Sequence, residues 1–149
     1  MARTFELATP IDGTVEEAWR VLTDFAAYVQ WNRLVPFGHG SATPGTHLEF
    51  RLRGRPGRRR PRVVTSTPPQ ELVLQDTVGH KTLLHMTHWF TFVPAAQSPG
   101  VDLCQRWRAE GMLVPLLWPL LRRDMARFAE FGHGLRDRVR ELRQVQGKT

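Results

Sequence analysis

Apolar residues in the last third of the chain repeat with the period of an α-helix. Between Leu113 and Gln144 they recur every three to four residues on one stripe, which is typical of a helix with one buried face. The pattern therefore predicts a single long helix packed against a large apolar surface. The residues of the stripe are Leu117, Leu121, Met125, Phe128, Phe131, Gly132, Leu135, Val139 and Leu142.

Upstream of this helix, apolar and polar residues mostly alternate, which predicts β-strands. A first strand, Thr4–Ala8, precedes two short helices at Val15–Leu22 and Phe25–Val29. Glycine- and proline-rich turns separate the later strands, which favours antiparallel pairing of consecutive strands. The fold class is therefore α+β, in a single domain over residues 1–149. The six later strands are expected at Arg33–Phe37, Thr46–Arg53, Pro61–Thr67, Glu71–Val78, Thr82–Val93 and Val101–Gly111.

The excess positive charge is confined to one segment. The net charge is +7, with 21 basic and 14 acidic residues. Seven arginines and no acid occur between Arg51 and Arg62, a segment called here the arginine hairpin. The charges of the rest of the chain balance. The sequence therefore contains a local basic patch and does not predict a generally basic surface.

Other features narrow the class of protein. Cys104 is the only cysteine, which excludes an internal disulfide and favours a reducing compartment. No apolar run reaches the length of a membrane span, and Met1–Thr4 begins no signal peptide, so a cytoplasmic protein is expected. No metal or cofactor is expected, because metal-ligand spacings and phosphate-binding loops are missing. His85 and His88 would point to opposite faces of their strand.

Several stretches, taken together, resemble a known family. They are Pro10–Trp19, Thr23–Phe25 with Tyr28 and Trp31–Asn32, Gly45–Leu48, His88–Pro94, and Gly111–Pro115. In this combination the chain resembles the START/Bet v 1-like (SRPBCC) superfamily and, within it, the bacterial polyketide cyclase/dehydrase-like proteins. The similarity covers nearly the whole chain. It departs at the arginine hairpin, at Trp107, and at Pro115 and Pro119.

The resemblance implies a helix-grip fold, in which a curved seven-stranded antiparallel sheet wraps around the C-terminal helix. Two short helices lie between the first and second strands. Family members hold lipids, sterols, hormones, polyketides or quinone-like molecules in a cavity between sheet and helix, and a minority are enzymes. The expected partner is therefore a small hydrophobic molecule, although fold alone does not define function.

The residues expected to bind this ligand lie on the inward faces of the predicted strands and helix. Two alternatives remain open for this region, a hollow cavity or a filled hydrophobic core. His88 and Gln105 favour a cavity, because an unpaired polar group in a core costs about 1–3 kcal/mol. Gly132 also favours it, since glycine lowers helix propensity by about 1 kcal/mol. The expected ligand-binding residues are Trp31, Phe50, Leu74, Met86, His88, Phe90, Phe92, Gln105, Trp107, Met125, Phe128 and Gly132.

An enzymatic alternative uses the same cavity. A cyclase or dehydratase would need acid–base groups there, and His88 and Asp124 are the catalytic candidates, with Tyr28 near the mouth. Asp124 falls within the apolar stripe, where Arg127 or an arginine of the last strand could neutralise it. Alternatively, Asp124 is solvated at the rim of the groove.

The arginine hairpin allows three interpretations. It is a solvated turn, a contact for anionic membrane lipids, or a contact for nucleic acid phosphates. A further alternative is that its charge acts on an acidic ligand entering the cavity. Arg51, Arg53 and Arg55 alternate along the strand and are expected to share the solvent face. The segment lacks exposed aromatic residues for base stacking, which disfavours nucleic acid.

Overall fold

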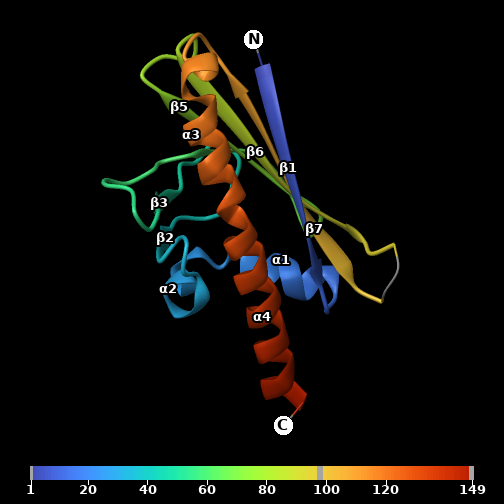
Figure 1. Ribbon diagram of the computed structural model, residues 1–149. Coiled ribbons are helices and arrows are strands. Elements are labelled where there is room, and N and C mark those ends of the chain that lie inside the picture. Colours follow the sequence, from blue (N-terminus) through green and yellow to red (C-terminus); the bar gives the residue numbers. More distant parts are fainter. Residues whose placement is uncertain (1, 97–98, 148–149) are drawn as a thin grey trace.

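A computed structural model describes residues 2–96 and 99–147. Its secondary structure follows the predicted order: one strand, short helices, further strands and a long helical C-terminal region (Figure 1). The elements are β1 (Ala2–Ile11), α1 (Val15–Thr23), the 3-10 turn η1 (Phe25–Ala27), α2 (Tyr28–Trp31), β2 (Phe37–His39), β3 (Glu49–Arg51), β4 (Arg62–Thr67), β5 (Glu71–Val78), β6 (Leu84–Pro94), β7 (Val101–Glu110), α3 (Val114–Ala126) and α4 (Phe128–Gly147).

The strands form two sheets, where the sequence predicted one of seven strands. Five strands pair in the order β1-β7-β6-β5-β4, and β2 pairs only with β3. All these pairs are antiparallel, as expected from the short turns. Isolated bridges from His47 to Arg62 and from Phe50 to Arg59 connect the smaller sheet to the β4 side of the larger one. The helix-grip arrangement is therefore confirmed, whereas the count of seven strands in one sheet is wrong.

The difference arises in two short segments. The predicted strand Arg33–Phe37 is largely a turn, because Oδ1 of Asn32 accepts a hydrogen bond from the backbone N–H of Val35 at 2.9 Å. The predicted strand Thr46–Arg53 is reduced to Glu49–Arg51. Side-chain alternation in these segments is compatible with a strand, but the backbone pairing depends on contacts that sequence periodicity does not reveal.

The C-terminal region is the long helix that the sequence predicted, divided at one residue into the segments α3 and α4. Residue Arg127 separates α3 from α4, and its backbone N–H lies 3.3 Å from the carbonyl of Arg123 and 3.2 Å from that of Asp124. This shared hydrogen bond tightens the last turn of α3. Figure 1 shows α3 and α4 following one another along one face of the large sheet. Within the described residues, neither they nor any other helix is long and apolar enough to cross a membrane.

The inward faces of the long strands are those that the sequence predicted. Leu72, Phe90 and Leu103 are buried on β5, β6 and β7 and belong to the main core cluster. Phe131 and Leu135 of α4 pack into the same cluster. A second cluster, which includes Trp107 and Met125, lies beneath α3. Burial of these apolar faces holds the helices against the sheet.

Gly132 lets α4 approach β1 closely. A methyl group at this position would lie 2.4 Å from Oγ1 and 3.1 Å from Cβ of Thr9, which is itself buried. Such distances do not occur without displacement of the helix or the strand. Gly132 therefore has a packing role at a helix–strand contact.

We expect Gly132→Ala to lower the free energy of unfolding by roughly 1–3 kcal/mol, as an overpacked core does. This is the net loss, after the higher helix propensity of alanine has offset about 1 kcal/mol of the cost of overpacking. Urea unfolding measures it. Gly147→Ala is the control, because nothing lies within 4 Å of an added Cβ there. Equal stability of the two variants would contradict the close contact with Thr9.

Candidate ligand-binding cavity

A cavity of about 140 Å³ lies between the inner face of the large sheet and the two C-terminal helices. Its wall is mainly apolar and aromatic, with charged side chains near one side. The lining residues are Leu22, Phe25, Tyr28, Val35, Phe50, Leu52, Arg59, Pro61, Leu72, Leu74, Asp76, Met86, His88, Phe90, Trp107, Leu121, Asp124, Met125, Phe128 and Phe131. The region under the helices is thus partly filled and partly hollow.

Most of the residues expected at the ligand site lie on this wall. The eight that line the cavity are Phe50, Leu74, Met86, His88, Phe90, Trp107, Met125 and Phe128. Four others lie elsewhere. Trp31 packs edge-on against Tyr28 and Phe131, Phe92 lies in the main core, and Gly132 contacts Thr9. Gln105 is buried behind the ring of His88.

Some wall residues were not expected at the site from sequence. Leu22, Phe25 and Val35 come from α1, η1 and the following turn, whose position over the sheet has no sequence signal. Leu121 could have been included, because it belongs to the apolar stripe of the predicted C-terminal helix. Arg59 and Asp76 line the wall as an ion pair, which joins residues from two different strand regions.

His88 and Gln105 form a polar connection between β6, β7 and α4. Nε2 of Gln105 donates to the backbone carbonyl of Phe128 at 3.1 Å. The amide oxygen of Gln105 then faces Nε2 of His88, also at 3.1 Å. This arrangement assigns the imidazole proton to Nε2 and leaves Nδ1 as a hydrogen-bond acceptor.

Nδ1 of His88 is the ring nitrogen that is not bonded to Gln105. No hydrogen bond to this atom occurs within the described residues. Among the described residues, Nδ2 of Asn32 is the one side-chain nitrogen or oxygen that is both enclosed and without a partner. Nδ1 of His88 has no partner but does not belong to that set. Nδ1 is therefore not enclosed by protein atoms. Because His88 lines the cavity, its accessible nitrogen presents a single acceptor to whatever occupies that space.

Aromatic packing keeps His88 neutral. Its ring lies 3.9 Å from that of Phe90 and 4.2 Å from that of Trp107, centroid to centroid, and Phe128 meets it edge-on. Burial lowers the pKa of His88 from 6.5 to about 3, although the hydrogen bond with Gln105 acts in the opposite direction. The site therefore contains a neutral imidazole at physiological pH.

Tyr28 is similarly fixed. Its hydroxyl donates to the backbone carbonyl of Leu22. Burial, with a smaller contribution from Asp24, raises the pKa of Tyr28 well above 10. The ring of Tyr28 contributes apolar surface to the cavity, and its hydroxyl is already bonded within the fold.

Two ion pairs lie at the charged side of the cavity. Arg55 contacts Asp124 of α3 at 2.7 Å, and Arg59 contacts Asp76 of β5 at 2.8 Å. Hydrogen bonding and attraction to Asp124 raise the pKa of Arg55. The expected partner Arg127 does not neutralise Asp124, because its side chain donates to the backbone carbonyl of Arg53. Its partner Arg55 lies 69 positions away in the sequence, and 28% of the Asp124 side chain stays exposed, so Asp124 is both paired and partly solvated.

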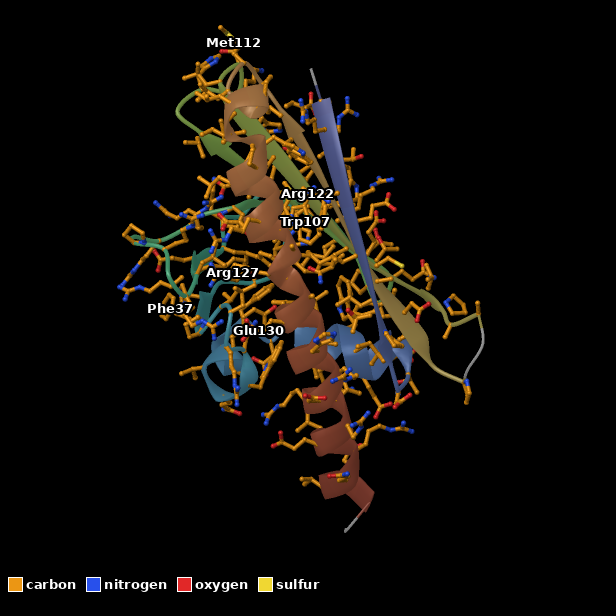
Figure 2. The ribbon with its side chains drawn as sticks, in the orientation of Figure 1. Phe37, Trp107, Met112, Arg122, Arg127 and Glu130 are labelled. Atoms are coloured by element: carbon orange, nitrogen blue, oxygen red, sulfur yellow. The ribbon has the colours of Figure 1, made fainter. Side chains whose placement is uncertain are left out.

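The arginine hairpin is bound to the body of the protein. Besides the pairs to Asp124 and Asp76, Arg53 binds Glu130 of α4 at 2.8 Å, and Arg58 binds Glu49 at 2.9 Å. In Figure 2, Arg127 and Glu130 lie where the helices meet the hairpin side of the molecule. Four of the seven arginines thus have acidic partners. The hairpin is thus anchored by acidic side chains next to the cavity, while Arg53 and Arg58 keep 52% and 46% of their side chains exposed to solvent.

The described residues contain no group of three or more histidine, cysteine, aspartate or glutamate side chains placed to hold a metal ion. His85 lies on the outer side of β6, where Nδ1 is 2.9 Å from the hydroxyl of Thr77. His88 lies inside, so the two rings face apart as the strand period predicted.

Known structures share the fold of this chain, although no family model and no curated protein matches its sequence. A point mutant of norcoclaurine synthase from Thalictrum flavum, bound to a transition-state analogue, has a TM-score of 0.76 at 11% identity, over 96% of this chain and 97% of that one. Another structure of that synthase contains dopamine and hydroxybenzaldehyde.

Two further structures belong to polyketide-related proteins. The polyketide cyclase-like protein Cgl2372 of Corynebacterium glutamicum has a TM-score of 0.56 at 14% identity, over 98% of this chain and 94% of that one. The di-domain ARO/CYC protein BexL has a TM-score of 0.64 at 14% identity, over 94% of this chain and 49% of BexL. These likenesses confirm the helix-grip fold.

The low pKa of His88 gives a pH dependence with a defined sign. Between about pH 6.5 and 3, the unfolded chain binds a proton at this position and the folded protein does not. The stability contribution is complete above pH 6.5 and is lost as the pH falls through this window, by at most about 1.4 kcal/mol per pH unit. We expect the wild type to lose more stability on acidification than His88→Phe. An imidazole NMR spectrum of charged His88 in the middle of the window would contradict this.

We expect Asp124→Asn to loosen the arginine hairpin, because Arg55 loses its charged partner. Trypsin should then cut after Arg53, Arg58 and Arg59 several-fold faster, since proteolysis reports local opening. Limited digestion with mass spectrometry measures the rates. Asp137→Asn, which breaks an exposed pair with the neighbouring Arg136, is the matched control. Equal cutting rates in the two variants would show that Asp124 does not hold the hairpin.

Proposed function

We propose that this protein binds a small, hydrophobic, ring-bearing molecule in the cavity between the sheet and helices α3 and α4. The observation that carries this proposal is the apolar and aromatic wall with one unpartnered acceptor, Nδ1 of His88. Ligand sites typically combine predominantly apolar walls with few polar groups that fix orientation.

The size of the cavity limits its occupant. The volume of about 140 Å³ is close to that of an engineered apolar cavity of about 150 Å³ that binds benzene. A single substituted ring therefore fits the closed conformation. A lipid or multi-ring polyketide requires the arginine hairpin to move, because Arg55 and Arg59 are paired across the charged side.

The neutral state of His88 favours a particular ligand chemistry. With its proton on Nε2 and directed to Gln105, the imidazole accepts a hydrogen bond from the cavity and donates none. A ligand with a hydroxyl or N–H group satisfies it. A ligand that presents only hydrogen-bond acceptors leaves both its acceptor and Nδ1 of His88 without a donor. A hydroxylated aromatic ring therefore matches both the wall and the acceptor.

The structural neighbours support this class of ligand. Norcoclaurine synthase is seen with dopamine and hydroxybenzaldehyde, both small hydroxylated rings. The polyketide cyclase-like and ARO/CYC neighbours bear names that refer to ring-forming chemistry. These proteins are 11–14% identical to this chain and share its fold. The ring compounds bound by norcoclaurine synthase therefore support a ring-sized occupant.

A cyclase or dehydratase activity has weaker support. A general base is most effective when its pKa is near the working pH, whereas that of His88 is about 3. Asp124 is engaged by Arg55, and the hydroxyl of Tyr28 is bonded to the backbone. The three candidate acid–base groups are therefore occupied or poorly basic. Ligand binding without catalysis explains the same geometry and requires no free acid–base group in the cavity.

We expect the protein to bind p-cresol and p-xylene, which have similar shapes and differ by a hydroxyl in place of a methyl group. Loss of the acceptor in His88→Phe should weaken p-cresol relative to p-xylene by about tenfold, the value of one buried hydrogen bond of about 1.4 kcal/mol. Calorimetric titration of both ligands gives the ratio of dissociation constants. The ratio cancels general effects of the substitution on the cavity.

Two further variants test the location. Met86→Trp should fill the cavity and abolish binding of both ligands, whereas Val93→Trp places the same side chain on the exposed face of β6 and should preserve it. Met86→Leu should change both affinities in parallel. Absence of binding by the wild type would refute the proposal. Binding with an unchanged ratio in His88→Phe would leave the cavity as a site and refute the role of His88.

A further inference from the structure

Helix α3 has a second apolar face, directed away from the cavity. Met112 just before the helix is 77% exposed, Leu116 is 76% exposed and Leu120 is 44% exposed. Their spacing of four residues aligns them along one side. The opposite side lines the cavity through Leu121 and Met125. A helix that is apolar on both sides usually has a second apolar environment to contact.

The turn between β5 and β6 extends this face. The backbone N–H groups of Met112 and Leu113 donate to the carbonyls of Thr82 and Leu83, at 2.9 and 3.0 Å. These bonds join the turn to the start of α3, at the tip of the molecule where Met112 is labelled in Figure 2. Val78 and Leu83 are 46% and 38% exposed there. The apolar cap is defined here as Val78, Leu83, Met112, Leu116 and Leu120.

Cations border the apolar cap. Arg122 and Arg123 lie two and three residues after Leu120 and are exposed, and Lys81 is exposed in the adjoining turn. Residues 111–123 include no acid, and the preceding Glu110 is paired with Arg108 at 3.1 Å. Within the described chain this combination differs from the arginine hairpin, where Arg53, Arg55, Arg58 and Arg59 are neutralised by acids.

We propose that the apolar cap docks on the surface of an anionic lipid membrane. Exposed leucine and methionine side chains would enter the boundary between headgroups and acyl chains, and Arg122, Arg123 and Lys81 would contact anionic headgroups. The contact is peripheral, since no helix in the described residues is long and apolar enough to span a bilayer.

A second copy of the chain fits this face less well. In a two-fold symmetric dimer each cation-bordered face would meet an identical one, so Arg122 and Arg123 would approach the same positive patch. An anionic lipid surface instead complements both the apolar residues and the charge. Docking would place the membrane on one side of α3 and the cavity on the other.

Vesicle flotation tests this proposal. We expect the wild type to bind vesicles of phosphatidylcholine with phosphatidylserine, to bind phosphatidylcholine alone more weakly, and to lose affinity as salt rises. Leu116→Glu with Leu120→Glu should reduce binding by at least about tenfold. Arg122→Gln and Arg123→Gln should each reduce it about fivefold, as expected for a cation near a charged surface.

Matched variants separate the cap from the general surface. Val29 is 72% exposed on α2, so Val29→Glu makes a similar change outside the cap and should leave binding unchanged. Arg60→Gln with Arg62→Gln removes two exposed charges at the arginine hairpin and should have a smaller effect than the Arg122 and Arg123 changes. Circular dichroism of each surface variant reports whether its fold is retained.

Three outcomes would overturn the proposal. The first is no binding of the wild type to phosphatidylserine vesicles. The second is equal loss of binding on substitution of the cap and of the hairpin arginines. The third is a solution dimer that Leu116→Glu with Leu120→Glu converts to a monomer, which would assign the face to a second copy. Binding of p-cresol in the cavity is measured without vesicles, so the two proposals stand or fall separately.

Discussion

Burial of the apolar stripe of α3 and α4 against the inner face of the large sheet is the constraint on which the rest of the structure depends. Leu135 and Phe131 lie in the main core with Leu72 and Leu103 of the sheet. At Gly132 the helix approaches β1 so closely that an added side chain would displace Thr9 or the helix. This contact fixes one end of the helical region. Towards α3 the same surfaces separate enough to leave a cavity beneath Leu121 and Met125.

Polar groups at this interface have two separate roles. Gln105 connects His88 to the backbone of Phe128, so the imidazole acts as an oriented acceptor in an aromatic wall. The pairs of Asp124 and Asp76 with arginines close the charged side of the cavity. A buried polar group requires a partner, and an acceptor that lines an apolar cavity without one is a reason to expect a ligand. The closing ion pairs are half-exposed and can open at modest cost.

Helix α3 occupies the position between the cavity and the outer apolar cap. Its inner side belongs to the proposed ligand site, and its outer side carries Leu116 and Leu120 into solvent. A binding protein for a hydrophobic molecule benefits from contact with the phase in which such molecules concentrate. The two proposals are independent, yet the same short helix supplies residues to both surfaces.

The sequence by itself determined the order of elements and the inward faces of β5, β6 and β7, because periodicities of 2 and 3.6 report which side of each element is buried. It also singled out His88 and Gln105 as polar residues on apolar faces. Tertiary structure decided which distant residues meet. The pairing of Asp124 with Arg55, the packing of Gly132 on Thr9 and the separate β2–β3 sheet follow from contacts between remote segments, which local patterns do not encode.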